Sequence, residues 1–215
     1  MNNKAKIKMI IRILNKTYPK VPVPLNYKNK FTLLVSVLLS AQCTDVNVNN
    51  VTKNIYPKYY KPHHFKKLGR KKIEKLIKKI GIFRIKAKSI YNLSKILIEQ
   101  HDSKVPKTFE ELEKLPGVGH KTASVVMSQG FGHPAFAIDT HIHRLAQRWG
   151  LTNGKNVIQT EKDLKRLFPK KDWNKLHLQI TSTIAFPIPK ISILSFLCFD
   201  WFFSIRITSS TNFTS

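Results

Sequence analysis

Apolar residues recur at three- and four-residue spacing through most of residues 1–180, and this periodicity constrains the fold more than any other feature. Such spacing places the apolar side chains along one face of a helix. A half-buried strand would instead alternate apolar and polar residues, and no convincing run of that kind occurs. The sequence therefore predicts an all-α protein.

Capping and helix-breaking residues set the limits of the predicted helices. Pro19 ends the first helix, Asp45 can cap the third, and Gly81 stops another. Thr108 and Glu111 form a capping box that opens a short helix. Helices are predicted over residues 4–18, 31–42, 45–56, 70–80, 85–100, 108–115, 120–129, 140–149, 160–168 and 172–180.

The charge of the chain points to a polyanion as its partner. The 215 residues include 38 Lys and Arg against 12 Asp and Glu, a formal charge of +26. Neutralising phosphates with such side chains releases counterions, so nucleic acid is the usual partner. The alternative is that an A/T-rich gene raised the lysine content without selection for binding. No long uncharged apolar run predicts a membrane span, and the N-terminus lacks the pattern of a signal peptide.

A short segment between two predicted helices carries the strongest candidate for chemistry, Leu115-Pro-Gly117-Val-Gly119-His120-Lys121. Its glycines allow a tight turn and a close approach to a ligand. The amide groups that open the following helix would bind an anion such as a DNA phosphate. An ordinary helix–helix turn is the alternative, and the two glycines alone do not exclude it.

Lys121 and Asp139 give this segment a possible catalytic role. A cation in the first turn of a helix is disfavoured by the helix dipole, which favours the neutral, nucleophilic form of the Lys121 amine. Asp139 follows after a further helix and return loop. A carboxylate beside the amine could take its proton or stabilise a cationic sugar. The alternatives are a solvated surface lysine and a simple helix cap.

Several segments together resemble the endonuclease III family of helix–hairpin–helix DNA glycosylases. They are LPGVGHKTA, AIDTHIHRLAQRWG, FTLLVSVLLSAQCTD and GIFRIKAKSI, and the resemblance covers about residues 5–180. It implies a two-lobed helical bundle with DNA in the cleft between the lobes. It also implies a bifunctional enzyme that removes oxidised pyrimidines and cleaves the strand 3′ to the abasic site by β-elimination. In this family pattern Lys121 would form the Schiff base and Asp139 would be its partner carboxylate.

The resemblance also suggests how the chain would hold DNA. Gln42 would fill the gap left by the flipped base, and Ile82 would take the wedge position usually occupied by leucine. His141 and Arg144 would face the DNA backbone. The expected DNA contacts are Gln42, Ile82, Leu115, Gly117, Gly119, His120, Thr140, His141 and Arg144. The expected partner is double-stranded DNA with damaged pyrimidines or abasic sites.

The resemblance ends near residue 180, where composition also changes. Residues 181–215 carry a net charge of +1 and six of the 13 Phe residues. The family normally ends with four cysteines that hold a four-iron four-sulfur cluster. This chain has two cysteines, Cys43 and Cys198, so we expect no cluster and no other metal site. The tail is either a product of a shifted reading frame or a genuine cluster-free variant.

The expected domains follow from these observations. Residues 1–22 form an N-terminal helix that packs on the second lobe, 23–134 a helical domain with the hairpin, 135–180 the rest of the second lobe, and 181–215 a divergent tail. Two alternatives remain to the enzyme: a non-catalytic helix–hairpin–helix DNA-binding module, and an inactive product of a decaying gene. We expect a monomer in the cytoplasm, associated with the nucleoid.

Overall fold

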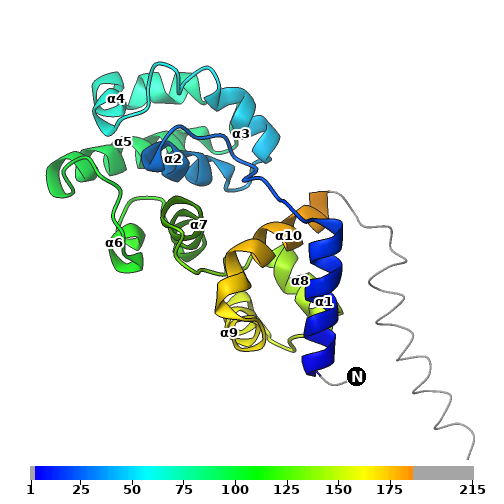
Figure 1. Cartoon of the computed structure of the whole chain (residues 1–215). Coiled ribbons are helices and arrows are strands. Elements are labelled where there is room, and N and C mark those ends of the chain that lie inside the picture. The colour runs from blue at the N-terminus through cyan, green and yellow to red at the C-terminus, as the bar shows by residue number, and fades with distance from the viewer. Residues whose placement is uncertain (1–2, 186–215) are drawn as a thin grey trace, which may run out of the picture. The chain divides into compact units, whose positions relative to one another are not determined.

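The computed structural model describes residues 3–185, with side chains described to residue 183 (Figure 1). This part of the chain contains ten α-helices and one short 3-10 helix but no strand, which confirms the all-α prediction for it. Of the predicted tail, residues 181–215, the first five belong to α10, and the part from residue 186 onward lies outside the described residues. None of the helices in residues 3–185 is long and apolar enough to cross a membrane. The elements are α1 (Asn3–Thr17), α2 (Lys30–Ser40), α3 (Asp45–Thr52), α4 (Pro62–Leu76), α5 (Phe83–Gln100), α6 (Phe109–Glu113), α7 (His120–Phe131), α8 (Thr140–Arg148), α9 (Val157–Leu167), η1 (Lys170–Asp172) and α10 (Trp173–Ala185).

The chain divides into two compact units. The central unit comprises residues 23–137, and the described part of the terminal unit comprises residues 3–22 and 138–185. The terminal unit therefore combines the first helix with helices from the end of the described chain. Each unit has its own buried apolar residues.

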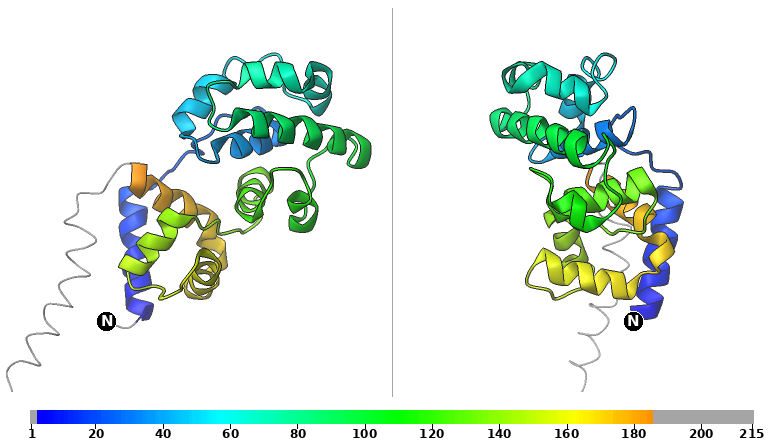
Figure 2. Two further views of the ribbon diagram at one scale, coloured as in Figure 1. Left: turned by 180° about the vertical axis from the view of Figure 1, so that it is seen from behind. Right: turned by 90° about the vertical axis from the view of Figure 1, so that its left-hand side faces the viewer.

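The core of the central unit forms around α2. This helix is apolar on nearly all sides, and residues 31–39 are all buried. Helices α3, α5 and α7 pack against it. Helix α4 packs along α5, as both views of Figure 2 show. Asn29 opens α2 with a capping box: its side chain accepts from the Thr32 amide, and the Thr32 hydroxyl accepts from the Asn29 amide. A fully apolar helix requires this central position, because every face must be covered.

The terminal unit is held together by α1 and α10. Ile7, Ile10 and Leu14 form the buried face of α1, and α10 packs against α1 and α8. The Gln179 amide group is fully buried and donates to Asn15 Oδ1 at 3.1 Å and to the Tyr18 carbonyl at 2.9 Å. These bonds fix the C-terminal end of α1 against α10, although the partners lie more than 160 residues apart in the sequence.

The start of α4 and the cap of α3 differ from the sequence prediction. Helix α4 was expected from residue 70, but it begins at Pro62 and continues through a break at Gly69, where φ is +71°. Glycine adopts that left-handed conformation without a side-chain penalty, so the helical turns on either side can follow one another. The cap of α3 is Thr44, whose hydroxyl accepts from the Asn47 amide at 3.3 Å, and Asp45 is the first helical residue. The Asp45 carboxylate is therefore not the capping group.

Candidate active site

The hairpin between α6 and α7 presents the start of α7 without a side-chain cap. Gly119 is the N-cap residue and makes no capping hydrogen bond of its own. Leu115 and Val118 anchor the turn in the core, and the Val118 amide donates to the Leu115 carbonyl at 3.1 Å. Leu115 was expected among the DNA contacts; its side chain is buried, so a contact there would use its backbone. Amide groups at such a helix start, with the positive end of the helix dipole, form an anion site.

The two glycines of the hairpin have different roles, which the sequence did not separate. Gly117 has φ of +80°, and a Cβ atom there would lie 2.8 Å from the Ser89 Oγ atom on α5. Gly117 is therefore required by the turn and by its packing on α5. Gly119 has φ of −95°, and a Cβ atom there would meet nothing within 4 Å. The protein itself tolerates a side chain at Gly119, so the open space there is available to a ligand.

Lys121 lies exposed in the first turn of α7 and has an acidic neighbour within the central unit. The Asp45 carboxylate is half-buried and interacts electrostatically with Lys121. Burial raises the pKa of Asp45, and the positive charge of Lys121 offsets part of that rise. Sequence reasoning assigned Asp45 to capping alone. Its proximity to Lys121 follows from the packing of α2, α3 and α7, for which the local sequence carries no signal.

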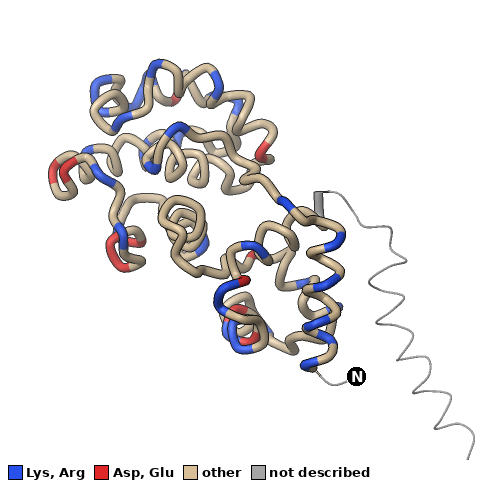
Figure 3. Tube along the Cα trace, viewed as in Figure 1, with Lys and Arg blue, Asp and Glu red and all other residues tan. Residues whose placement is uncertain are grey.

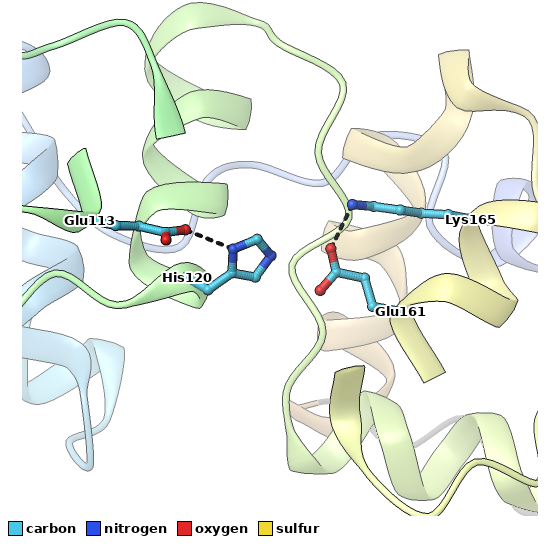
Figure 4. Close-up of polar contacts among 4 residues, drawn as sticks. All are labelled: Glu113, His120, Glu161 and Lys165. Atoms are coloured by element: carbon cyan, nitrogen blue, oxygen red, sulfur yellow. Dashed lines mark hydrogen bonds and ion pairs between the residues drawn. The ribbon is translucent and has the colours of Figure 1, made fainter. Parts of the chain in front are cut away.

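His120 links the two helices of the hairpin (Figure 4). Its Nδ1 atom lies 2.8 Å from Glu113 Oε1, and its ring stacks on Phe109 with ring centroids 5.9 Å apart. Both partners belong to α6, so these contacts set the orientation of the imidazole beside the start of α7. The His120 side chain remains more than half exposed and retains room to contact a ligand.

Gln42 and Ile82 lie on two loops that meet in the central unit. A Cβ atom on Gly81 would lie 3.5 Å from the Gln42 carbonyl oxygen, so the loop before α5 lies against the loop after α2. Gln42 has φ of +54° and Ile82 has φ of +50°, and both side chains are exposed. A left-handed conformation is rare for any residue with a side chain and rarer still for a β-branched one. Strained backbone of this kind is concentrated at functional sites.

A separate group of predicted site residues lies at the start of α8 in the terminal unit. Asp139 is the N-cap, and its Oδ1 atom accepts from the amides of His141 at 3.0 Å and Ile142 at 2.8 Å. Both capping bonds thus use one oxygen of the carboxylate. Thr140, His141 and Arg144 are exposed at the start of the same helix. His143, directly before Arg144, forms a hydrogen bond with the buried Thr160 hydroxyl at 2.7 Å and so has a structural role.

Basic side chains occur on helices of both units, whereas acidic side chains are few (Figure 3). Some of the acidic groups pair with neighbouring bases. Glu161 and Lys165 lie one turn apart on α9, with 2.5 Å between Glu161 Oε1 and Lys165 Nζ (Figure 4). Arg70 and Glu74 form a similar pair on α4 at 2.8 Å. The remaining excess of positive charge attracts a polyanion to either unit.

Comparison with known proteins agrees with this arrangement. A family model described as "HhH-GPD superfamily base excision DNA repair protein" matches residues 35–170. Endonuclease III of Bacillus subtilis (strain 168) is 43% identical over 178 residues, which are 82% of this chain and 81% of the relative. A non-covalent endonuclease III–DNA complex matches with a TM-score of 0.87 and 37% identity, over 96% of this chain and 100% of that one. A trapped endonuclease III–DNA covalent intermediate matches with a TM-score of 0.81 and 40% identity, over 85% of this chain and 86% of that one.

The sequence segments that suggested the family lie on the elements that build the candidate site. The hairpin and Lys121 open α7, Asp139 caps α8, and Gln42 and Ile82 lie on the paired loops. The family match spans all of these residues. This chain belongs to the HhH-GPD superfamily of base excision DNA repair proteins, and the relatives compared above are endonucleases III.

Proposed function

We propose that this protein is a bifunctional DNA glycosylase and abasic-site lyase that acts on oxidised pyrimidines in duplex DNA. The observation that carries the proposal is the exposed Lys121 amine at the start of α7, beside the anion site of the hairpin. A DNA-binding module would need the hairpin but would have no use for an amine at this position. Its substrate would place the protein at the chromosome, in the cytoplasm.

The chemistry begins with attack of the Lys121 amine on C1′ of the damaged nucleotide. A bond forms between Nζ and C1′, and the bond from C1′ to the base breaks, so the base leaves with the electron pair. Opening of the sugar ring gives a Schiff base. Loss of a proton from C2′ then expels the phosphate at C3′, which cleaves the strand, and water releases the enzyme.

Two carboxylates would serve this reaction. Asp139 takes the proton of the attacking amine or stabilises the positive charge that develops on the sugar. Its capping bonds support this role, because they hold one carboxylate oxygen in place and so fix the direction of the other. Asp45, half-buried and near Lys121, would orient the amine for attack. A positioned amine reacts faster than one that samples many rotamers.

Extrusion of the damaged base would rely on the two strained loops. The exposed Gln42 side chain would fill the vacated position in the duplex, and Ile82 would wedge between the neighbouring bases. Unstacking and unpairing a base costs a few kcal/mol, which such contacts must offset. The hairpin amides would hold a phosphate on the bent backbone.

Borohydride trapping on duplex DNA with an abasic site tests the proposal directly. The reductant converts a Schiff base into a stable covalent bond, so the enzyme should remain attached to the labelled strand. Without reductant the same duplex should be cleaved on the 3′ side of the abasic site. A protein that bound the duplex but gave neither product would be a non-catalytic helix–hairpin–helix module.

The different roles of the hairpin glycines give a separate prediction. Gly119→Ala should fold normally, because the new Cβ atom meets nothing in the protein. It should weaken binding to damaged and undamaged duplex by the same factor, about tenfold, because the lost contact is to a phosphate and not to a base. Titration of both duplexes by fluorescence anisotropy measures this.

Gly117→Ala is the matched control for that variant. Its Cβ atom would collide with Ser89 at a backbone angle that alanine disfavours, so the melting temperature should fall. A binding defect of Gly119→Ala confined to damaged DNA would place Gly119 in the base pocket and contradict the phosphate assignment.

The residues of this chain do not fit the iron–sulfur cluster of the family. Such a cluster needs four thiolates, and the sequence has two cysteines. Cys43 lies in the central unit, where its Sγ atom accepts a hydrogen bond from the Asn47 side chain at 3.3 Å. Within residues 3–185 no three His, Cys, Asp or Glu side chains group together as metal ligands.

We expect the purified full-length chain to lack the brown colour and visible absorption of an iron–sulfur protein. Such a cluster is held by four cysteine thiolates, and the sequence supplies two. Iron analysis by mass spectrometry on protein made in iron-supplemented cells provides the measurement. About four iron atoms per chain would contradict the prediction and would require a ligand set beyond the two cysteines.

A further inference from the structure

A buried lysine on α5 joins the two loops that carry Gln42 and Ile82. We infer that Lys86 is a positioning residue that holds these loops together in the conformation needed to enter DNA. The inference rests on the proposed function, in which both loops act on the duplex. Lys86 itself is 4% exposed and so makes no contact with DNA.

Lys86 lies in the first turn of α5, directly after the Ile82 loop, and its side chain bonds to the Gln42 loop. Its Nζ atom donates to the Leu39 carbonyl at 2.9 Å and to the Ala41 carbonyl at 2.6 Å, at the end of α2 and directly before Gln42. Its backbone amide donates to the Ile82 carbonyl at 3.2 Å. The Lys86 side chain therefore links the start of α5, which follows Ile82, to the chain directly before Gln42.

The carbonyl groups that Lys86 binds belong to the C-terminal turn of α2. Such groups have no partner within their own helix and require one from elsewhere. A cation suits the site because it also meets the negative end of the helix dipole. The Lys86 ammonium thus caps the C-terminal end of α2, at the point where the chain enters the Gln42 loop.

A second link runs across the same two loops from α3. The Asn47 side-chain amide donates to the Lys79 carbonyl at 3.1 Å, two residues before Gly81, and lies 3.3 Å from Cys43 Sγ. Strained backbone persists only where its surroundings over-determine it. The Lys86 and Asn47 bonds provide that restraint for the left-handed Gln42 and Ile82 residues.

A lysine side chain at this buried position costs free energy of folding unless its ammonium group is hydrogen-bonded. Residue 86 precedes the buried face of α5, which continues through Ala87, Ile90 and Leu93. Burial disfavours the ammonium and lowers the pKa of Lys86. An apolar side chain would fill such a place without that cost. The hydrogen bonds to the Gln42 loop are what the lysine supplies and an apolar residue does not.

The test compares Lys86→Met with Lys88→Met in the full-length protein. Methionine keeps the unbranched apolar stem of lysine and removes the three donors. Lys88 is exposed two residues further along α5, so its variant controls for the loss of one positive charge. Borohydride trapping on a single-stranded oligonucleotide with an abasic site gives the amount of active enzyme, because that substrate needs no base extrusion.

Single-turnover excision of an oxidised pyrimidine from duplex DNA is then measured per active molecule. We expect Lys86→Met to slow this step at least tenfold, the order of effect of a lost wedge contact, with trapping on single-stranded DNA within about twofold of wild type. Lys88→Met should stay within about twofold on both substrates, since it loses one charge of many. A 2-aminopurine base opposite the lesion should lose its fluorescence rise on binding only with Lys86→Met.

Other outcomes would overturn the inference. Equal losses of Lys86→Met on both substrates would show that Lys86 only supports the fold, and no loss on the duplex would show that the loops need no such restraint. If Lys86→Met does not fold, Lys86→Arg replaces it, because arginine keeps the charge and displaces the hydrogen-bond donors. A lower ratio of duplex excision to single-stranded trapping in Lys86→Arg would then support the inference, and an unchanged ratio would overturn it. Failure of the wild-type protein to be trapped on any substrate would instead refute the proposed function.

Discussion

Lys121→Gln should abolish both borohydride trapping and strand cleavage at an abasic site. Glutamine is similar in length but has no nucleophilic amine, so no Schiff base can form. Binding of the same duplex should stay within about tenfold of wild type, because one positive charge of many is lost. Trapping, cleavage and anisotropy on one labelled duplex measure all three quantities under the same conditions.

Lys114→Gln is the matched control for this variant. Lys114 is an exposed lysine at the end of α6, on the other side of the hairpin, and carries the same charge. Its loss should weaken DNA binding about as much as the loss of Lys121 and leave trapping intact. Continued covalent trapping by Lys121→Gln would show that another amine is the nucleophile.

The helices could be predicted from the sequence where an amphipathic pattern and a clear cap coincide. Helix α8 is an example: Asp139 caps it, Gly150 follows its end with φ of +62°, and apolar residues recur between them. Helix α4 begins earlier than predicted, because it continues through Gly69 in a left-handed conformation that the apolar periodicity does not reveal. The outcome at Gly69 depends on the packing of α4 along α5, which a local pattern does not contain.

The positions of the site residues could be predicted more readily than their surroundings. The motifs located Lys121, Asp139, Gln42 and Ile82 in the chain, but periodicity gives no indication that an isoleucine adopts φ of +50°. Lys86 was missed because it is one of many lysines in a helix with a basic outer face. Its side chain bonds to Leu39 and Ala41, which lie 47 and 45 positions earlier in the chain. The one local signal is its place four residues before the buried Ile90.

Asp139→Asn should leave the fold intact while base excision falls by roughly two to four powers of ten, the range of a positioned acid–base group. Asparagine is nearly as good an N-cap as aspartate, and its Oδ1 atom can accept the amides of His141 and Ile142 as before. The substitution therefore replaces only the second carboxylate oxygen, the one proposed to act on the amine or the sugar. Single-turnover excision and thermal melting on the same preparation give the two quantities.

Asp139→Ala separates the cap from the carboxylate. Alanine removes both capping bonds at the start of α8, so this variant should lose about 1 kcal/mol of stability in addition to its activity. If Asp139 acts as proposed, the asparagine variant melts like wild type and is as inactive as the alanine variant. If the asparagine variant keeps its activity and only the alanine variant loses it, Asp139 is a helix cap, and the proton of the Lys121 amine must go to another group. Asp45 would then be the first to replace, since its carboxylate interacts with Lys121 within the central unit.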